Sequence, residues 1–456
     1  MASEWPKRSL KELGVTLIDC VHKTPAAVEN GIPYIGIPQM DNGRINFDAE
    51  PRLISESDFV KWTEKANPKY GDVVLSRRCN PGETAYVPRD AKFALGQNLV
   101  LLRPEGKEIH PEFLRWAVQG KEWWDEVERY KNPGAIFDSL KCADIPKFQI
   151  PFPPVVEQKK ISRFLSSISG KIELNRQINQ TLEQIAQALF KSWFVDFDPV
   201  IDNALAAGNP IPDELQERAE RRQQQRAKPE HQPLPEHIRQ LFPSEFELTE
   251  SLGWVPKGWT IRALDEIATF LNGLALQKFR PTNDERFLPV LKISHLRQGY
   301  TDNNERASAD IDKQYVVKDG DVIFSWSGTL MIDIWCGGKA ALNQHLFKVS
   351  SNDYPRWFYY LQTLSHLENF QRIASDKAVT MGHIKRGDLS NAKCLVPSSD
   401  IINMTTKILE PLIEKKIESR LGSNQLTLVR DTLLPKLISG ELRIPETQSQ
   451  IEQALA

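Results

Sequence analysis

The sequence predicts an α+β fold in which two similar mixed α/β domains are separated by an antiparallel coiled coil of two long helices. Three observations support this prediction. A chain of 456 residues is too long for a single hydrophobic core. Blocks of the first half return in the same order in the second half, which indicates a duplicated domain. Each half also ends in a long helical stretch with an apolar stripe, which has the seven-residue spacing of a coiled coil in the first half and is less regular in the second.

We expect six segments along the chain. They are a first domain at 1–155, a central helix at 156–196, a polar and proline-rich connector at 197–253, a second domain at 254–400, a C-terminal helix at 401–440 and a tail at 441–456.

The clearest repeated block is YGDVVLSRR at 70–78, which returns as KDGDVIFSW at 318–326. The Gly-Asp pair predicts a tight turn that leads into a buried strand, VVL or VIF, and the following residues then project beyond the strand end. Four further blocks repeat about 250 residues apart. They pair 5–13 with 259–267, 32–37 with 288–293, 94–98 with 341–345, and 135–145 with 379–389.

The first long helix begins after the helix-stopping PFPP at 151–154 and carries an apolar stripe with heptad spacing, and the second carries a comparable but less regular stripe. Two such stripes in one chain are expected to bury each other as an antiparallel pair. The predicted coiled-coil and partner-binding residues are Ile161, Ile168, Ile178, Leu182, Ile185 and Leu189 in the first helix, and Leu412, Leu426, Val429 and Leu433 in the second.

Asn175 interrupts the first stripe at a heptad position. We expect it to face solvent at a loose point of the seam. The alternative is a buried polar contact that fixes the register of the two helices.

The connector is expected to form an exposed helix followed by an extended proline-rich segment. Its arginines, Arg218, Arg221, Arg222 and Arg226, are interleaved with acidic residues. Because the charges are mixed, a solvated helix face is favoured over a DNA contact.

Composition limits the possible function. The formal net charge is −2 at pH 7, so any contact with nucleic acid has to come from local basic surface. The five cysteines are scattered without a CxxC pair, which argues against a structural zinc or a disulfide scaffold and favours a reducing compartment. With no signal-peptide pattern and no stretch of 18 apolar residues, the chain is expected to be soluble and intracellular.

Enzyme motifs are missing or incomplete. The nearest match to an amino-methyltransferase motif, NPKY at 67–70, lacks the second proline, and no glycine-rich cofactor loop precedes it. The EQK at 157–159 lacks the upstream acidic residue of a nuclease site, and there is no phosphate-binding GxxxxGK[ST] loop. The histidines form no HExxH pair. We therefore expect no catalytic residue and no metal site in this chain.

Residues suited to DNA binding follow the repeated strands. Arginine can hold guanine or phosphate in a bidentate manner, and asparagine or glutamine can do the same for adenine. The candidates are Ser76, Arg77, Arg78, Asn80, Gln97 and Asn98 in the first half, and His295, Arg297, Ser325, Trp326, Ser327, Gln344 and His345 in the second. Gln39, Met40 and Asp41 occupy the positions that match 295–297. Lys377, Lys385 and the segment 129–132 are candidate phosphate contacts.

Each candidate taken alone is also consistent with an ordinary polar surface residue. The prediction depends on the group of loops, in which a conserved scaffold carries different residues in the two halves. Two readers of different DNA sequences would differ in this way.

These features together resemble the specificity subunit of type I restriction-modification systems, and the resemblance covers nearly the whole chain. It is carried by the duplicated halves, by the Trp-x-x-x-x-Leu opening of each half and by the GD[VI][VI]xS blocks. Further support comes from PPxxEQKKI at the start of the central helix, LFKSWFVDFDP at 189–199 and LLPKLISGELRI at 433–444.

The resemblance implies that each half is a target-recognition domain that binds one part of a split, asymmetric sequence in double-stranded DNA. It implies that the helices set the spacer and dock two methyltransferase subunits, and that restriction subunits join the assembly. S-adenosylmethionine, ATP and Mg²⁺ would then belong to partner subunits in a prokaryotic cytoplasm, with no cofactor in this chain. Two alternatives stay open: a duplicated-domain protein-interaction adaptor without DNA specificity, and a DNA-modifying enzyme in its own right.

Overall fold

The computed structural model describes residues 5–134, 136–229, 231–282, 286–302, 304–376 and 382–444. The chain divides into two compact units. The first unit contains residues 1–172 and 425–456, and the second unit contains residues 173–424. Among the residues that the structure describes, no helix combines the length and the apolar character needed to cross a membrane.

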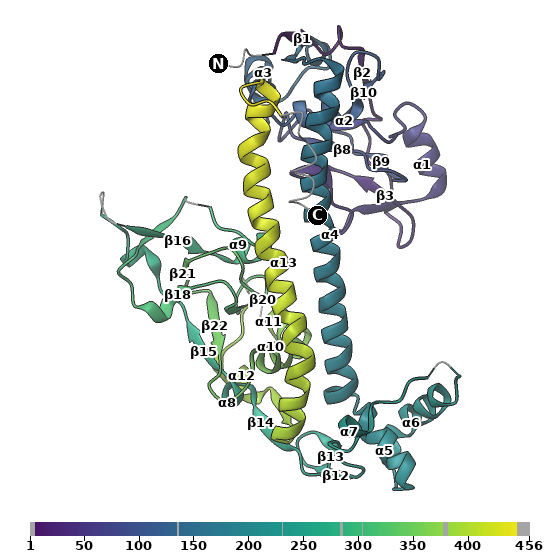
Figure 1. Ribbon diagram of the computed structural model, residues 1–456, viewed down its shortest axis with the longest axis vertical. Helices are drawn as coiled ribbons and strands as arrows, with labels where there is room; N and C mark the ends of the chain where they lie inside the picture. Colours follow the sequence, from purple (N-terminus) through teal and green to yellow (C-terminus); the bar gives the residue numbers. More distant parts are fainter. Residues whose placement is uncertain are drawn as a thin grey trace. The chain divides into compact units, whose positions relative to one another are not determined.

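Two long helices, α4 (Val155–Phe190) and α13 (Ser399–Ser439), each contribute to both units (Figure 1). Within the second unit Asn175 of α4 contacts Ser423 of α13, whereas Glu183 of α4 contacts Lys416. Residue numbers thus rise along one helix as they fall along the other, so the pair is antiparallel. This confirms the predicted coiled coil and the mixed α/β class.

The first unit is built around a six-stranded sheet with the strand order β2-β10-β7-β8-β5-β4. Two smaller sheets, β6-β3-β9 and β1-β11, complete its strands. The strands are β1 (Lys7–Ser9), β2 (Val15–Asp19), β3 (Ile32–Ile35), β4 (Met40–Asp41), β5 (Gly43–Ile45), β6 (Arg52–Ile54), β7 (Val73–Ser76), β8 (Thr84–Tyr86), β9 (Ala94–Leu95), β10 (Leu99–Pro104) and β11 (Gln149–Pro151).

Helices α1 (Glu56–Thr63), α2 (Pro111–Ala117) and α3 (Lys121–Tyr130) complete the first unit, with short 3₁₀ turns at Ile37–Gln39 and Ile145–Lys147. Its main core lies between the sheet and the helices, and it extends onto the long helices. Ile161 and Leu165 of α4 and Leu437 and Ile438 of α13 are buried in this core.

The second unit repeats this arrangement with a four-stranded sheet, β15-β22-β19-β20, and a second sheet, β17-β16-β21-β18. Its two-stranded sheets are β14-β23 and β12-β13. The strands are β12 (Phe246–Thr249), β13 (Gly253–Pro256), β14 (Thr260–Ala263), β15 (Thr269–Asn272), β16 (Phe287–Leu291), β17 (Arg306–Ser308), β18 (Val316–Val317), β19 (Val322–Ser325), β20 (Met331–Ile334), β21 (Ala340–Leu342), β22 (Leu346–Ser350) and β23 (Lys393–Val396).

The helices of the second unit cover its sheets and form the connector. They are α5 (Asp198–Ala207), α6 (Asp213–Arg226), α7 (Glu236–Arg239), α8 (Leu264–Ile267), α9 (Ile293–Gln298), α10 (Arg356–Ser365), α11 (Leu367–Asp376) and α12 (Arg386–Asn391). A π-helical turn at Lys191–Val195 follows α4, and 3₁₀ turns lie at Leu276–Lys278 and Lys313–Tyr315.

The repeated Gly-Asp pair forms the same turn in both units. The Asp72 carboxylate accepts a hydrogen bond of 2.8 Å from the backbone N–H of Lys69, and Asp321 accepts one of 2.8 Å from Lys318. The preceding glycine, at 71 or 320, has a positive φ of 93° or 89°, which favours glycine. Every residue of the strands that follow, β7 and β19, is buried.

The coiled-coil seam follows the predicted heptads at its start and leaves them later. Ile161 and Ile168 are buried, but Ile185 is 47% exposed, and Ala186 and Phe190 are buried in its place. A straight α-helix falls about 20° behind a seven-residue repeat in each heptad, so the buried position moves to later residues. Ile185 was therefore predicted wrongly as a seam residue, and so was Val429, which is 45% exposed.

The other predicted seam residues are at least partly covered. Leu189, Leu412 and Leu433 pack against the cores of their units, and Ile178, Leu182 and Leu426 are half-buried. Asn175 does not face solvent as expected. It is buried, and its Nδ2 donates hydrogen bonds to Ser423 Oγ at 3.1 Å and to the Ser419 carbonyl at 3.4 Å.

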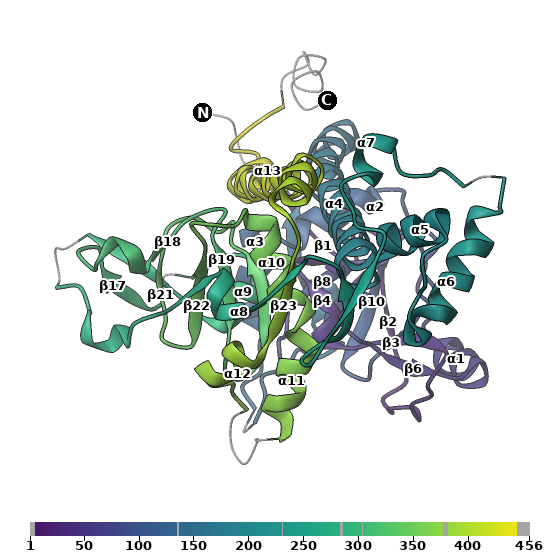
Figure 2. The same cartoon turned by 90° about the horizontal axis from the view of Figure 1, so that it is seen from below.

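The connector is more ordered than the sequence predicts. Instead of one helix and an extended segment, it forms α5, α6, α7 and the β12-β13 hairpin, and α5 and α6 lie side by side (Figure 2). Arg218 pairs with Asp196 at 2.6 Å and with Asp198 at 3.0 Å, and Arg222 pairs with Asp202. These two arginines therefore hold α6 on α5 rather than forming a solvated face.

A polar network ties the second unit to both of its helix segments. Lys416 of α13 pairs with Glu183 of α4, and Tyr360 of α10 donates a hydrogen bond of 3.0 Å to the same carboxylate. Arg420 donates to both Asp333 oxygens at 2.9 Å, which joins α13 to β20. Burial is the strongest single influence and opposes ionisation of Glu183, but the charge of Lys416 together with the hydrogen bonds from Lys416, Gln187 and Tyr360 outweighs it and lowers the pKa of this carboxyl.

The substitution Glu183→Gln should lower the free energy of unfolding of the second unit by about 2 kcal/mol, because it leaves Lys416 buried without its main partner. The matched control Glu418→Gln, at the exposed Lys415–Glu418 pair within α13, should cost less than about 0.5 kcal/mol. Because folding lowers the pKa of Glu183, its contribution is present at neutral pH and is lost as the pH falls below the usual glutamate range. Urea unfolding at neutral and acidic pH measures the differences, and equal effects of the two substitutions would contradict this role.

Candidate nucleic-acid interface

Three neighbouring strands of the first unit bring their loops to one edge of the sheet. In the antiparallel register Leu99 of β10 lies opposite Ser76 of β7, and Val100 lies opposite Asp19 of β2. The residues after β2, after β7 and before β10 therefore lie next to one another. We call this set of loops the first strand-end site.

Arg77 is at the centre of the first strand-end site and is half-buried. Its backbone N–H donates to the Asn98 carbonyl at 3.0 Å, and its Nη2 lies 3.5 Å from His22 Nε2. The same His22 nitrogen is 2.9 Å from Asp19 Oδ2, while His22 Nδ1 is 2.9 Å from the Gln97 carbonyl. A short chain of polar contacts thus links Asp19 through His22 to the guanidinium.

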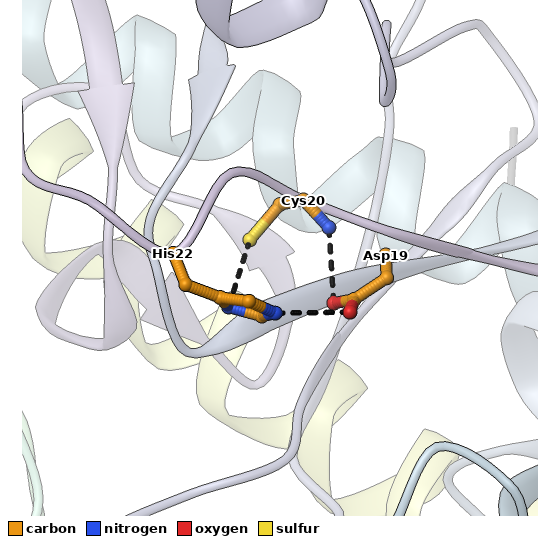
Figure 3. Close-up of side chains that lie close together, drawn as sticks. All are labelled: Asp19, Cys20 and His22. Atoms are coloured by element: carbon orange, nitrogen blue, oxygen red, sulfur yellow. Dashed lines mark hydrogen bonds and ion pairs between the residues drawn. The ribbon is translucent and has the colours of Figure 1, made fainter.

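Asp19, Cys20 and His22 are grouped closely enough to be considered as metal ligands (Figure 3). Burial raises the pKa of the Cys20 thiol to about 11, and this thiol donates to the Gly96 carbonyl at 3.3 Å. A metal ligand would have to be the thiolate. Because both His22 nitrogens also have polar partners, the arrangement favours a hydrogen-bonded support for Arg77 over a metal site.

The second unit has an equivalent strand-end site with different chemistry. Trp326 follows β19 as Arg77 follows β7, and its backbone N–H donates to the His345 carbonyl at 3.4 Å. Its indole Nε1 donates to Asn272 Oδ1, at the end of β15, at 3.1 Å. Ser327 Oγ lies 3.0 Å from His345 Nδ1, and Gln344 Nε2 lies 3.3 Å from His345 Nε2. An aromatic and amide surface therefore replaces the arginine.

A further loop joins each strand-end site at the same backbone position. The Leu140 N–H donates to the Arg77 carbonyl at 2.8 Å, and the Ile384 N–H donates to the Trp326 carbonyl at 3.1 Å. Isolated β-bridges, Arg78 with Ser139 and Ser327 with His383, reinforce these contacts. The two sites thus share a backbone frame and differ in side chains.

Several predicted site residues are placed where they can meet a ligand. Arg78, Asn80, Gln97, Arg297 and Lys385 are exposed, while Arg77, Asn98, Trp326, Gln344 and His345 are half-buried. Arg297 also donates to Thr329 Oγ1 at 3.0 Å. Lys377 lies outside the described residues.

Other predicted site residues belong to the scaffold. Ser76 and Ser325 are fully buried, and their hydroxyls donate to the carbonyls of Arg78 at 3.0 Å and Ser327 at 3.1 Å, because each is the last inward-facing residue of its strand. Ser327 is also buried. His295 is buried with Nδ1 2.9 Å from the Val290 carbonyl.

The match of 39–41 to 295–297 is structural as well. Gln39 is buried and donates to the Ala49 carbonyl, and Met40 is buried beside it. Asp41 pairs with Arg44 at 2.8 Å. These residues therefore hold turns of the fold.

Sequence reasoning missed Asp19, His22 and Asn272. They follow or end strands that carry no distinctive motif, and only the antiparallel pairing of β2 with β10 and of β15 with β22 brings them to the sites. The sequence offered one signal for them: all three lie between the first and second repeated blocks of their half.

Comparison with known proteins identifies the family. The family model described as "Type I restriction modification DNA specificity domain" matches residues 2–184 and again residues 256–426. The chain belongs to this family. Its two matched regions correspond to the two halves predicted from the repeated blocks.

Curated relatives of this specificity family match along most of the chain. The HindI specificity subunit of Haemophilus influenzae is 27% identical over 82% of this chain and 87% of its own length. The MjaIX specificity subunit of Methanocaldococcus jannaschii is 26% identical over 97% of this chain and 94% of its own length. The crystal structure of the S subunit from M. genitalium has a TM-score of 0.51 and 16% identity over 96% of both chains, which supports the fold.

Thiol labelling tests the environment assigned to Cys20. At pH 8 the native chain should react with iodoacetamide at the exposed Cys79, while Cys20, which is buried and has a pKa of about 11, should react only after unfolding. Mass spectrometry of labelled peptides gives the rates. If Cys20 were labelled as fast as Cys79 is, its thiol would be accessible and reactive. That result would contradict the buried, hydrogen-bonded thiol and would favour a metal-ligand role.

Proposed function

We propose that each unit reads one half of a split, asymmetric DNA sequence and that the chain is the non-catalytic specificity subunit of a type I restriction-modification complex. The observation that carries this proposal is the shared backbone frame that presents Arg77 in one unit and Trp326 in the other. A guanidinium favours guanine or phosphate, whereas an indole beside an amide favours apolar and stacking contacts. Two such sites would prefer different bases.

An exposed cationic side chain at each strand-end site supports contact with a polyanion. Arg78 is exposed, and within the described residues its guanidinium has no ion-pair partner. Lys385 is exposed beside the second site. Phosphate contacts of this kind position a protein on DNA and make its affinity fall with added salt.

The long helices are proposed to dock two methyltransferase subunits. Both helices leave large apolar side chains exposed, which would suit contact with a protein partner. These are Val155, Val156, Leu174 and Ile185 on α4, and Leu428 and Val429 on α13. Restriction subunits would join the same assembly in the cytoplasm. S-adenosylmethionine, ATP and Mg²⁺ would be bound by the partners.

The helices are also proposed to set the gap between the two half-sequences. With 36 residues, α4 is about 54 Å long at 1.5 Å per residue. That length corresponds to about one and a half turns of B-DNA. A rigid helix pair of this length would act as a ruler.

Exchange of the loop 77–80 tests the reading assignment. Replacing these residues with those of another specificity subunit should change the half-sequence read by the first unit and leave the other half and the spacer unchanged. Methylation mapping of host DNA is the measurement. A change in both half-sequences, or in neither, would contradict the assignment.

Insertion of seven residues into each long helix tests the ruler. The spacer should lengthen by about three base pairs, because seven residues add about 10 Å and a base pair spans about 3.4 Å. A control insertion of seven residues between α6 and α7 should leave the spacer unchanged. Methylation mapping that shows altered half-sequences at an unchanged gap would contradict the ruler.

The rival function is a protein-interaction adaptor, favoured only by the exposed apolar residues of the helices. It predicts no DNA affinity that depends on salt, whereas DNA reading predicts a steep fall in affinity with added salt. Binding measured at several salt concentrations separates the two.

A further inference from the structure

The residues between Asn132 and Ser139 form a loop that adjoins the first strand-end site. Backbone hydrogen bonds close it at its base, because Asn132 N–H donates to the Ser139 carbonyl at 2.8 Å and Ser139 N–H donates to the Asn132 carbonyl at 3.0 Å. The next residue, Leu140, donates to the Arg77 carbonyl at 2.8 Å. The base of this loop is therefore attached to the backbone of the predicted DNA-reading residues.

The loop holds two large apolar side chains in solvent. Ile136 is 81% exposed and Phe137 is 59% exposed, and they are adjacent in sequence. Close approach within the loop requires glycine at 134, because a Cβ there would lie 2.1 Å from the Phe137 carbonyl oxygen. We call Ile136 and Phe137 the apolar tip.

The surroundings of the apolar tip indicate its ligand. Arg78, which is exposed, forms a β-bridge with Ser139 at the base of the loop, and Arg77 accepts the hydrogen bond from Leu140. Lys131 lies next to the base, but it is already paired with Glu128 at 2.7 Å and with Asp138 at 3.7 Å. The two arginines at the base and the apolar side chains at the end match a ligand with phosphates outside and apolar base surfaces inside, which is the arrangement of a DNA groove.

We propose that the apolar tip enters a groove of the target DNA and makes apolar contacts with bases of the half-sequence read by the first unit. This inference rests on the proposed function and adds specificity-determining residues to it. Apolar side chains contact thymine methyl groups in the major groove or wedge between base steps in the minor groove. Neither contact releases counterions, so the tip should act on affinity without acting on its salt dependence.

The test compares variants of the full chain assembled with its methyltransferase partners, on duplexes that carry the mapped sequence. The double variant Ile136→Ser and Phe137→Ser should weaken specific binding about ten-fold or more, the scale of one good base contact. The slope of log affinity against log salt should stay that of the unaltered protein. Gly134→Ala, which keeps both apolar residues but displaces the loop, should weaken binding in the same direction.

The matched control is Val60→Ser on α1, which removes another apolar side chain of the first unit that is 62% exposed. It should bind as the unaltered protein does. Unchanged affinity of the double variant would overturn the proposal. So would weaker assembly with the methyltransferase at unchanged DNA affinity, which would assign the tip to a protein contact. If the unaltered complex showed no specific DNA binding, the proposed function itself would fail, and this outcome is visible without any variant.

Discussion

The backbone hydrogen bonds at the strand ends are the constraint on which the rest of the structure depends. In each unit the residue after the central buried strand donates to the loop before a neighbouring strand and accepts from a third loop, through Arg77 in one case and Trp326 in the other. Backbone groups make these bonds, so the side chains at the same positions are free to differ. The frame therefore allows two surfaces of different chemistry to be built on one fold.

A second constraint concerns the long helices, which must keep one axial alignment relative to each other. Apolar contacts alone permit a helix pair to slide, whereas buried polar contacts are satisfied in one alignment only. Asn175 with Ser423 and Glu183 with Lys416 supply such contacts within the second unit. Arg420 and Asp333 extend the network to the sheet. Within the second unit these contacts fix the alignment of the two helices.

Much of the fold could be predicted because the two halves of the sequence contain the same blocks in the same order. The repeated Gly-Asp turn identified both central strands, and the apolar stripes, regular in the first helix and less regular in the second, identified both helices. The seam residue Ile185 was misplaced because a straight helix drifts from a seven-residue repeat. Ser76, Ser325 and His295 were assigned to the sites because their types suit DNA, but burial makes them scaffold. Asp19, His22 and Asn272 were missed, because strand pairing brings them to the sites and no distinctive motif marks them.

The central claim is that the two strand-end sites read two different short sequences at a fixed separation. Single-molecule methylation mapping of host DNA, with and without this chain, tests it most directly. The account predicts a bipartite motif with two dissimilar halves and a constant gap, which disappears when the chain is absent. A motif that persists without the chain, or one with identical halves, would contradict it.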